Sequence, residues 1–193
     1  VNAEPKSRAG GHLDVQAFVH NTGGFGADAA LLVDVVDEDG AVIAHFSGPP
    51  HLVPVGDEAP LAVEGDVPGV APWSPDEPNL YQMVVMLQVD GLTVDTRRLK
   101  IGFRTVEARE GRLFLNGEPI YLTGYNRHED SPTRNMCSDL ELVRRDLQQM
   151  KASGANFVRL CHYPHHPKEL DLCDELGLLA MDEIPLYWWN GLA

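Results

Sequence analysis

Apolar and polar residues alternate in short stretches along the N-terminal half of the chain, as they do in strands with one buried face. Residues 13–19 alternate in this way, apolar stretches follow at 30–36 and 41–46, and two further segments of strand length lie at 82–89 and 92–101. Two connections contain Asp-Gly pairs, Asp39-Gly40 and Asp90-Gly91, which are typical of tight β-hairpins. No helical period of useful length interrupts them. The pattern predicts an immunoglobulin-like β-sandwich over residues 1–104, without the cysteine pair of antibody domains.

The pattern changes after Gly102-Phe103-Arg104, where strands and helices begin to alternate. A small hairpin is expected at 105–108 and 112–115, followed by strands at 119–125, 155–161 and 178–181. The last of these is wholly apolar, which predicts a strand covered on both faces. The first helix is expected to open with a capping box of Ser138 and Glu141 and to stop at Gly154. A second helix, 168–176, ends at Gly177.

Strands that alternate with helices in this way build a parallel sheet, because right-handed crossovers return each strand beside the one before it. The residues alone allow either an open doubly wound sheet or a (β/α)8 barrel. A full barrel needs about 250 residues, so residues 105–193 would supply only its first three strands. Under the barrel interpretation this segment would be the N-terminal part of a larger barrel, and the residues alone do not choose between the two folds.

Composition disfavours nucleic-acid and membrane-surface partners. The chain has 15 Lys and Arg against 29 Asp and Glu, a formal charge of -14, and such a field repels nucleic acid and anionic lipid. No apolar run reaches the roughly 18 residues that cross a bilayer. The start at Val1 has neither a signal-peptide pattern nor an initiator Met, so we expect the natural N-terminus to be missing.

Three cysteines, Cys137, Cys161 and Cys173, form neither a disulfide framework nor a zinc-ribbon spacing. We interpret them as reduced thiols, which favours a reducing compartment such as the cytoplasm.

Polar residues gather where each strand of the second region ends. These groups are 126–130 after the first strand, 162–166 after the second, and Asp182-Glu183 at the close of the third. In parallel α/β folds the carboxyl ends of the strands carry the ligand-binding loops. Three coincident groups therefore predict a functional site at this edge.

These segments resemble glycoside hydrolase family 2, the β-galactosidases and β-glucuronidases. The residues that carry the resemblance are Gly102-Phe103-Arg104, Leu115-Asn116-Gly117-Glu118-Pro119, Gly124-Tyr125-Asn126-Arg127-His128-Glu129, Arg159-Leu160-Cys161-His162-Tyr163-Pro164, Leu172 to Gly177 and Asp182-Glu183, with Trp73 to Tyr81 upstream. The resemblance implies a β-sandwich followed by an incomplete TIM (β/α)8 barrel, in an enzyme that cleaves β-linked glycosides with retention. Such chemistry uses two carboxylates about 5 Å apart.

By the same resemblance, both catalytic glutamates belong to later strands, the first in an Asn-Glu pair, so we assign no catalytic residue here. His128 and His162 match histidines that line the sugar subsite, and Asn126 and Glu183 are expected to bind substrate beside them. Arg159 is expected to brace carboxylates, with Asp182 in a supporting role. As neighbours in a strand, Asp182 and Glu183 point to opposite faces and cannot serve as the catalytic pair.

One departure from the family concerns metal. Magnesium-dependent β-galactosidases carry Glu-x-His after the third strand, whereas this chain has Tyr187-Trp188-Trp189. We therefore expect no metal site and no cofactor. Trp188 could stack on a sugar ring or simply pack at the barrel mouth. A zinc site built from His162, His165 and His166 is disfavoured because two prolines lie in that loop.

The sequence leaves two other functions open. The chain could be a non-catalytic carbohydrate-binding or protein-interaction module, or, with a poorer fit, an independent α/β enzyme that uses Asp182 or a histidine. In the leading interpretation the partner is a β-linked sugar. Self-association through the uncovered edge of the incomplete barrel is a further expectation.

Overall fold

The computed structural model describes residues 1–186, apart from residue 8 and residues 132–134 and 137–138. It divides into two compact units. The first comprises Val1–Trp73, Asn79–Glu107 and Leu115–Gly117, and the second comprises Ser74–Pro78, Ala108–Phe114 and Glu118–Ala193. The short segment Ser74–Pro78 thus belongs with the second unit, although the chain on either side of it belongs to the first.

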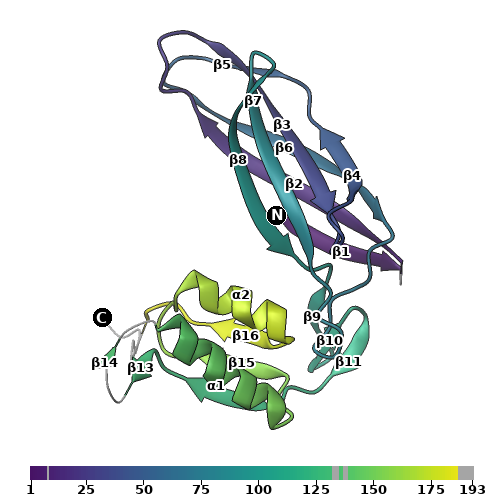
Figure 1. The fold of residues 1–193 in the computed structure, drawn as a ribbon, viewed down its shortest axis with the longest axis vertical. Helices are drawn as coiled ribbons and strands as arrows, with labels where there is room; N and C mark the ends of the chain where they lie inside the picture. Colours follow the sequence, from purple (N-terminus) through teal and green to yellow (C-terminus); the bar gives the residue numbers. More distant parts are fainter. Residues whose placement is uncertain (8, 132–134, 137–138, 187–193) are drawn as a thin grey trace. The chain divides into compact units, whose positions relative to one another are not determined.

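The first unit is an immunoglobulin-like sandwich of two antiparallel sheets (Figure 1). One sheet has the order β1-β2-β6, made of β1 (Asn2–Ser7), β2 (Gly10–His20) and β6 (Glu58–Pro68). The other has the order β4-β3-β7-β8, with β5 on β3, made of β3 (Ala27–Val36), β4 (Val42–Ser47), β5 (His51–Val53), β7 (Tyr81–Val89) and β8 (Leu92–Ile101). The predicted strands are confirmed, whereas β1, β5 and β6 were not predicted.

Alternate residues of the two sheets meet in one hydrophobic core. Leu13 and Val15 of β2 and Val33 and Val35 of β3 are at most 2% exposed. Their polar neighbours face outward, as the period of two requires. The predicted Asp90-Gly91 hairpin is also present, with φ of 50° and 79° at the two residues. Glycine tolerates this left-handed backbone and aspartate accepts it better than most residues.

The predicted strand 119–125 is wrong in one respect, because it is two strands in different sheets. β9 (Val106–Arg109), β10 (Arg112–Leu115) and β11 (Glu118–Ile120) form a small sheet, and β12 (Gly124–Arg127) begins the next one. Asn156 holds the chain between them, since its side chain donates to Tyr121 O and accepts from Thr123 N. Local apolar pattern cannot reveal such a change of partner.

The second unit is built on a parallel sheet of order β12-β15-β16, which includes β15 (Phe157–Leu160) and β16 (Leu179–Asp182). Both helices, α1 (Leu140–Ala152) and α2 (Pro167–Leu176), pack side by side on one face of it (Figure 1). A doubly wound sheet would carry helices on both faces. The one-sided arrangement is that of a barrel wall. A two-stranded pair, β13 (Asp130–Ser131) and β14 (Asn135–Met136), lies between β12 and α1 in the chain.

The helix caps explain where α1 and α2 begin and end. Asp139, rather than the predicted Ser138, is the N-cap of α1, and its carboxylate accepts from the backbone N–H of Glu141 and Leu142. Ser138 itself lies outside the described residues. α2 begins at Pro167 and ends before Gly177, whose φ of 71° is the left-handed C-cap expected from the sequence.

The prediction that β16 is covered on both faces is wrong for the described residues. Its burial runs from half-buried Leu179 to exposed Met181 and Asp182. β16 is an edge strand, and of the described elements only β15 pairs with it. In the part of the chain that is described, no helix is long and apolar enough to cross a membrane.

Candidate functional site

The register of the parallel sheet sorts neighbouring residues onto opposite faces. Asn126 of β12 is paired with Arg159 of β15, and Arg159 with Met181 of β16. Residues in register across parallel strands point to the same side. Since Arg127 and Leu160, one position on, are buried under the helices, Asn126 and Arg159 lie on the face that the helices leave open.

An ion-paired cluster forms at the carboxyl ends of β15 and β16. Arg159 Nε donates to Glu183 Oε1 at 2.6 Å, and His162 Nδ1 lies 3.1 Å from Glu183 Oε2. Arg159 Nη2 also lies 3.2 Å from His162 Nδ1. The three side chains are between 23% and 36% exposed, so the cluster is half-buried yet open to solvent on one side.

The cluster sets the charge of Glu183. The hydrogen bond from Arg159, with a second from His162, holds the pKa of Glu183 below its usual range although partial burial opposes this. The same pair raises the pKa of Arg159. Glu183 is therefore a fixed anion at neutral pH, which can accept hydrogen bonds from hydroxyl groups but cannot act as a proton donor.

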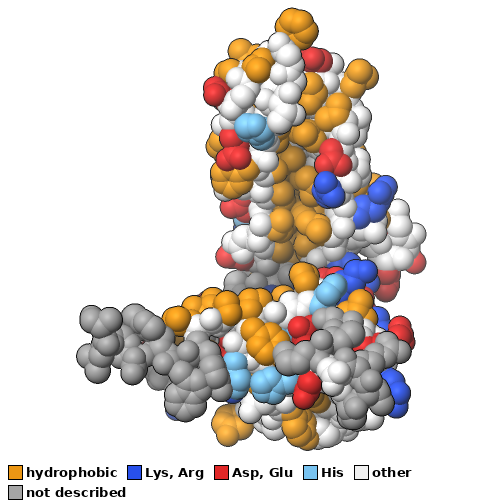
Figure 2. All heavy atoms as spheres, turned by 90° about the vertical axis from the view of Figure 1, so that its left-hand side faces the viewer, with side chains coloured by type: hydrophobic (Ala, Val, Ile, Leu, Met, Phe, Trp, Pro, Cys, Tyr) orange, Lys and Arg blue, Asp and Glu red, His pale blue; other side chains and the backbone are white. Residues whose placement is uncertain are grey.

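Two further rings lie beside this cluster. The ring of His128 meets that of His162 edge to face at 5.2 Å between centroids, and it lies 6.1 Å from Tyr163. His128 is exposed, whereas His162 and Tyr163 are half-buried. Figure 2 shows histidine side chains beside carboxylates on this unit. The two histidines expected to face sugar thus lie together, on loops that follow different strands.

A hollow opens beside the cluster. It has a volume of about 660 Å³ and is lined by Arg159, His162, Met181, Asp182, Glu183, Ile184 and Leu186. Its walls combine a cation, an imidazole and carboxylates with three apolar side chains. Sugar rings have hydroxyl edges and apolar faces, so this mixture suits a pyranose.

The remaining predicted residues separate in the structure. Asp182 Oδ1 accepts from the backbone N–H of His165 at 3.2 Å, while Glu183 is held by Arg159, so the two adjacent carboxylates engage different partners. Asn126 is exposed in β12. Trp188 and its neighbours Tyr187 and Trp189 lie outside the described residues.

The ring nitrogens of His162, His165 and His166, the candidate zinc ligands, each contact a different partner. His162 lies against Glu183, and His166 accepts at Nδ1 from the backbone N–H of Lys168 as the N-cap of α2. His165 contacts Glu169 and the carbonyl of Cys161.

Two other groups bring potential ligand atoms within 4.8 Å of one another: His128 with Cys161 and His162, and Glu129 with His165 and Glu169. In the second group, Arg127 donates to Glu169 at 2.9 Å. The guanidinium thus already provides the positive charge that a metal ion would bring to this carboxylate. In the first, the Cys161 thiol donates to Arg127 O at 3.3 Å.

Sequence reasoning missed the polar network under the helices, which joins the buried Arg127, Glu169 and His165 to the half-buried Asp146. A signal existed, since Glu169 occupies the same stripe of α2 as Leu172 and Cys173, where an apolar residue is expected. A charged residue at a buried helical position implies a charged partner elsewhere in the chain. The spacing does not reveal which partner.

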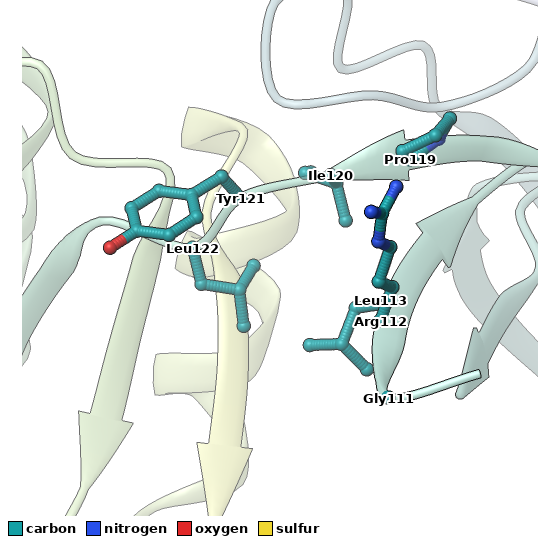
Figure 3. A pocket seen from close by; sticks show the side chains of 7 residues that line it. All are labelled: Gly111, Arg112, Leu113, Pro119, Ile120, Tyr121 and Leu122. Atoms are coloured by element: carbon teal, nitrogen blue, oxygen red, sulfur yellow. The ribbon is translucent and has the colours of Figure 1, made fainter. Parts of the chain in front are cut away.

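A second hollow, of about 580 Å³, lies beside the small sheet and is lined by Gly111, Arg112, Leu113, Pro119, Ile120, Tyr121 and Leu122 (Figure 3). Leu113 and Leu122 lie toward each other across it, and Tyr121 points away. Tyr121 is 86% exposed. Its lining has no carboxylate and no imidazole, and its phenol, that of Tyr121, points away, so the hollow does not present an acid-base pair.

A β-sandwich followed by parallel β/α units, with both described helices on one face of the sheet, defines a class of proteins in which a sandwich domain precedes a (β/α)8-type segment. The comparison with protein-family models identifies the family. Residues 1–104 match the model described as glycosyl hydrolases family 2, and residues 106–190 match the TIM barrel domain of the same family. The chain belongs to glycosyl hydrolase family 2. Its second unit is accordingly the first part of a (β/α)8 barrel.

Individual relatives agree with this assignment. The chain is 43% identical over 115 residues to a β-galactosidase of Vibrio cholerae, an alignment that covers 59% of this chain and 11% of that protein. It is similarly 42% identical over 112 residues to a β-galactosidase of Pectobacterium atrosepticum, covering 58% and 11%.

Solved structures extend the likeness to both units. A glycosyl hydrolase family 2 member from Bacteroides cellulosilyticus superimposes with a TM-score of 0.85 at 26% identity, covering 95% of this chain and 25% of that one. A Parabacteroides merdae β-glucuronidase gives 0.79 at 32% identity, covering 95% and 23%. The aligned part of the chain therefore covers about a tenth of the curated relatives' length, and the chain spans about a quarter of these structures' length.

Proposed function

We propose that this chain contributes part of the sugar-binding subsite of a retaining enzyme that hydrolyses β-linked glycosides. The observation that carries the proposal is the cluster of Arg159, His162 and Glu183 with His128 beside it, at the carboxyl ends of neighbouring barrel strands. Within the chain we propose a sandwich domain at 1–104 and a barrel segment at 105–193.

Each side chain of the cluster has a role that follows from its chemistry. The ionised Glu183 presents acceptors to sugar hydroxyls, and Arg159 keeps it charged and fixes its direction. The imidazoles of His128 and His162 donate to, or accept from, further hydroxyls. Asn126, in register with Arg159 on the same face, adds an amide. Hydrogen bonds to hydroxyls that strengthen as the glycosidic bond breaks lower the barrier.

Cleavage itself needs two carboxylates on either side of the bond, about 5 Å apart, one neutral and one ionised. Glu183 is held ionised by Arg159, and Asp182 is hydrogen-bonded to the backbone of His165. They are not such a pair. No Asn-Glu pair occurs in the chain either. We propose that the 193 residues bind sugar but do not cleave it.

The test uses the full-length parent enzyme, in which the subsite is complete. His128→Ala and His162→Ala should each lower kcat/KM by roughly 10 to 1000-fold, a loss of about 1.4 to 4 kcal/mol of transition-state stabilisation. His20→Ala, exposed on β2 of the sandwich, is the matched control and should leave kcat/KM unchanged. Wild-type kinetics in both site variants would remove these histidines from the sugar site.

The competing function, a non-catalytic binding module, predicts a different result. If the parent protein folds but hydrolyses no β-galactoside, β-glucuronide or β-mannoside, while this chain still binds the corresponding methyl glycosides, the module interpretation is correct.

A further inference from the structure

A group of charged side chains lies on the helix-covered face of the barrel sheet, outside the sugar site. Arg127 of β12 and Glu169 of α2 are 6% and 0% exposed, and Arg127 Nη1 donates to Glu169 Oε1 at 2.9 Å. Arg127 also reaches Asp146 of α1, with both Nε and Nη2 at 3.3 Å from Oδ2. His165, also 6% exposed, completes the group. Buried charges of this kind persist only when they are paired.

Both ring nitrogens of His165 face oxygens that can only accept. Nδ1 lies 3.2 Å from Glu169 Oε2, and Nε2 lies 3.2 Å from the backbone oxygen of Cys161. A neutral imidazole has one N–H, so one of these contacts would set a nitrogen lone pair against an oxygen lone pair. We infer that His165 carries both ring protons, and that this buried imidazolium anchors the Cys161 carbonyl and with it the backbone from which His162 projects.

The proton could instead reside on Glu169, but its surroundings argue against this. The guanidinium of Arg127 donates to the same carboxylate, and an adjacent cation favours the ionised form of a carboxyl group. A neutral Glu169 would also deprive the buried Arg127 of its buried anionic partner, since the other carboxylate that Arg127 reaches, Asp146, is 35% exposed.

The other groups around His165 are compatible with a cation. The ring of Tyr163 stacks on it at 5.1 Å with an interplanar angle of 20°, and a π-face attracts positive charge. Asp182 accepts from its backbone N–H. Burial raises the pKa of the nearby Cys173 thiol to about 12, so that group adds no charge. Glu129 adds a further carboxylate, because its oxygen, a ring nitrogen of His165 and an oxygen of Glu169 lie within 4.8 Å of one another, and its Oε1 also accepts from the backbone N–H of His166. A nearby anion favours the charged form of an imidazole.

These contacts place the His162 backbone between fixed points. Cys161 N donates to Arg127 O at 3.0 Å, Cys161 O accepts from His165 Nε2, and His165 N donates to Asp182 Oδ1. His165 is thus a positioning residue that acts through the loop. That role rests on the proposed function of His162, whereas the charge of His165 does not.

Nuclear magnetic resonance of the imidazole nitrogens in the purified 193-residue chain tests the charge directly. At a pH of about 8, an ordinary histidine with a pKa near 6.5 is almost entirely neutral. We expect His165 to show two protonated nitrogens, as a signal that vanishes in His165→Gln. The control His20→Gln removes an exposed histidine of the sandwich and should leave the signal in place.

Glu169→Gln separates the charge from the packing. A glutamine can accept from Arg127 through its oxygen and donate to His165 Nδ1 through its amide, so His165 should become neutral with its proton on Nε2. Loss of the Glu169 charge should also loosen the loop, so that the amides of Cys161 and His165 exchange hydrogen on the order of ten-fold faster, while those of β3 do not change.

The wild-type spectrum decides the charge even if neither variant folds. A single protonated nitrogen on wild-type His165 at this pH would overturn the inference, as would two protonated nitrogens in Glu169→Gln. Unchanged exchange at Cys161 and His165 in a folded Glu169→Gln would refute the positioning role. Wild-type kinetics in the His162→Ala variant of the parent enzyme would contradict the proposed function without touching the charge of His165, so the two failures are distinguishable.

Discussion

Replacing Lys151 with methionine should destabilise the barrel unit and leave the sandwich untouched. Lys151 lies in the last turn of α1, and its Nζ donates to the backbone oxygen of Pro75 at 2.6 Å and to that of Gly177 at 2.9 Å. Pro75 belongs to the segment Ser74–Pro78, which packs with the second unit although it lies between two strands of the first. One ammonium group therefore ties this segment and the C-cap of α2 to α1.

The magnitude follows from these two bonds. A hydrogen bond from a charged donor contributes about 1.5 to 3 kcal/mol when buried, and the half-buried Lys151 should contribute less per bond. Methionine retains most of the apolar contacts of the lysine stem. We expect a net loss of about 2 kcal/mol in the free energy of unfolding of this unit, which corresponds to roughly 30-fold faster exchange of its most protected amides.

Amide hydrogen exchange measures the two units separately, which a single melting curve would not. The reporters are Val158 and Leu160, buried in β15, and Val33 and Val35, buried in β3. Lys168→Met, at an exposed position of α2, is the matched control for loss of a charge. If Lys151→Met accelerates the β15 amides less than about 3-fold, or accelerates those of β3 equally, the reasoning fails.

Three further outcomes are expected. The purified chain should hydrolyse no aryl β-galactoside or β-glucuronide above background, and turnover that survives repurification but is lost in Glu183→Gln would contradict this. The pKa of Glu183 is lowered in the folded protein, so its ion pair with Arg159 should stabilise the site at pH values above the unfolded pKa of about 4.3. This stabilisation should be lost as the pH falls through the folded pKa. If the carboxyl group of Glu183 titrates no lower than that of an exposed glutamate, the pairing is refuted. Amides of β16, an edge strand, should exchange faster than those of β7 in a monomer, and equal protection would show that the half-barrel is self-sufficient.

Local pattern predicted the elements whose signal is repeated or chemically specific. The alternation at Leu13 to Val19, the Asp90-Gly91 turn and the Gly177 cap all have the structures expected of them. β6 was missed although Ala59, Leu61 and Val63 alternate, because Pro60 interrupts a strand pattern. The structure resolves this, since β6 is at the edge of its sheet, where a proline can be accommodated.

The sequence by itself determined that polar residues gather at the ends of three strands, and the motifs around His128 and His162 were enough to indicate the family. The sequence alone was enough for these two conclusions because strand period, turn residues and motif spacing depend only on residues that are close together along the chain. All of the site assignments stay predictions: His128, His162, Asn126, Glu183 and Trp188 as substrate-binding residues, and Arg159 and Asp182 as supporting ones.

Only the tertiary structure decided which polar residues share a site. Asn126 and Arg127 are adjacent in sequence, yet one is exposed on the open face while the other is buried and pairs with Glu169, 42 positions away. Arg159 meets Glu183 across 24 positions. Such pairs form because the parallel register aligns β12, β15 and β16 and because burial forces each charge to find a partner. Neither condition is a local property of the chain.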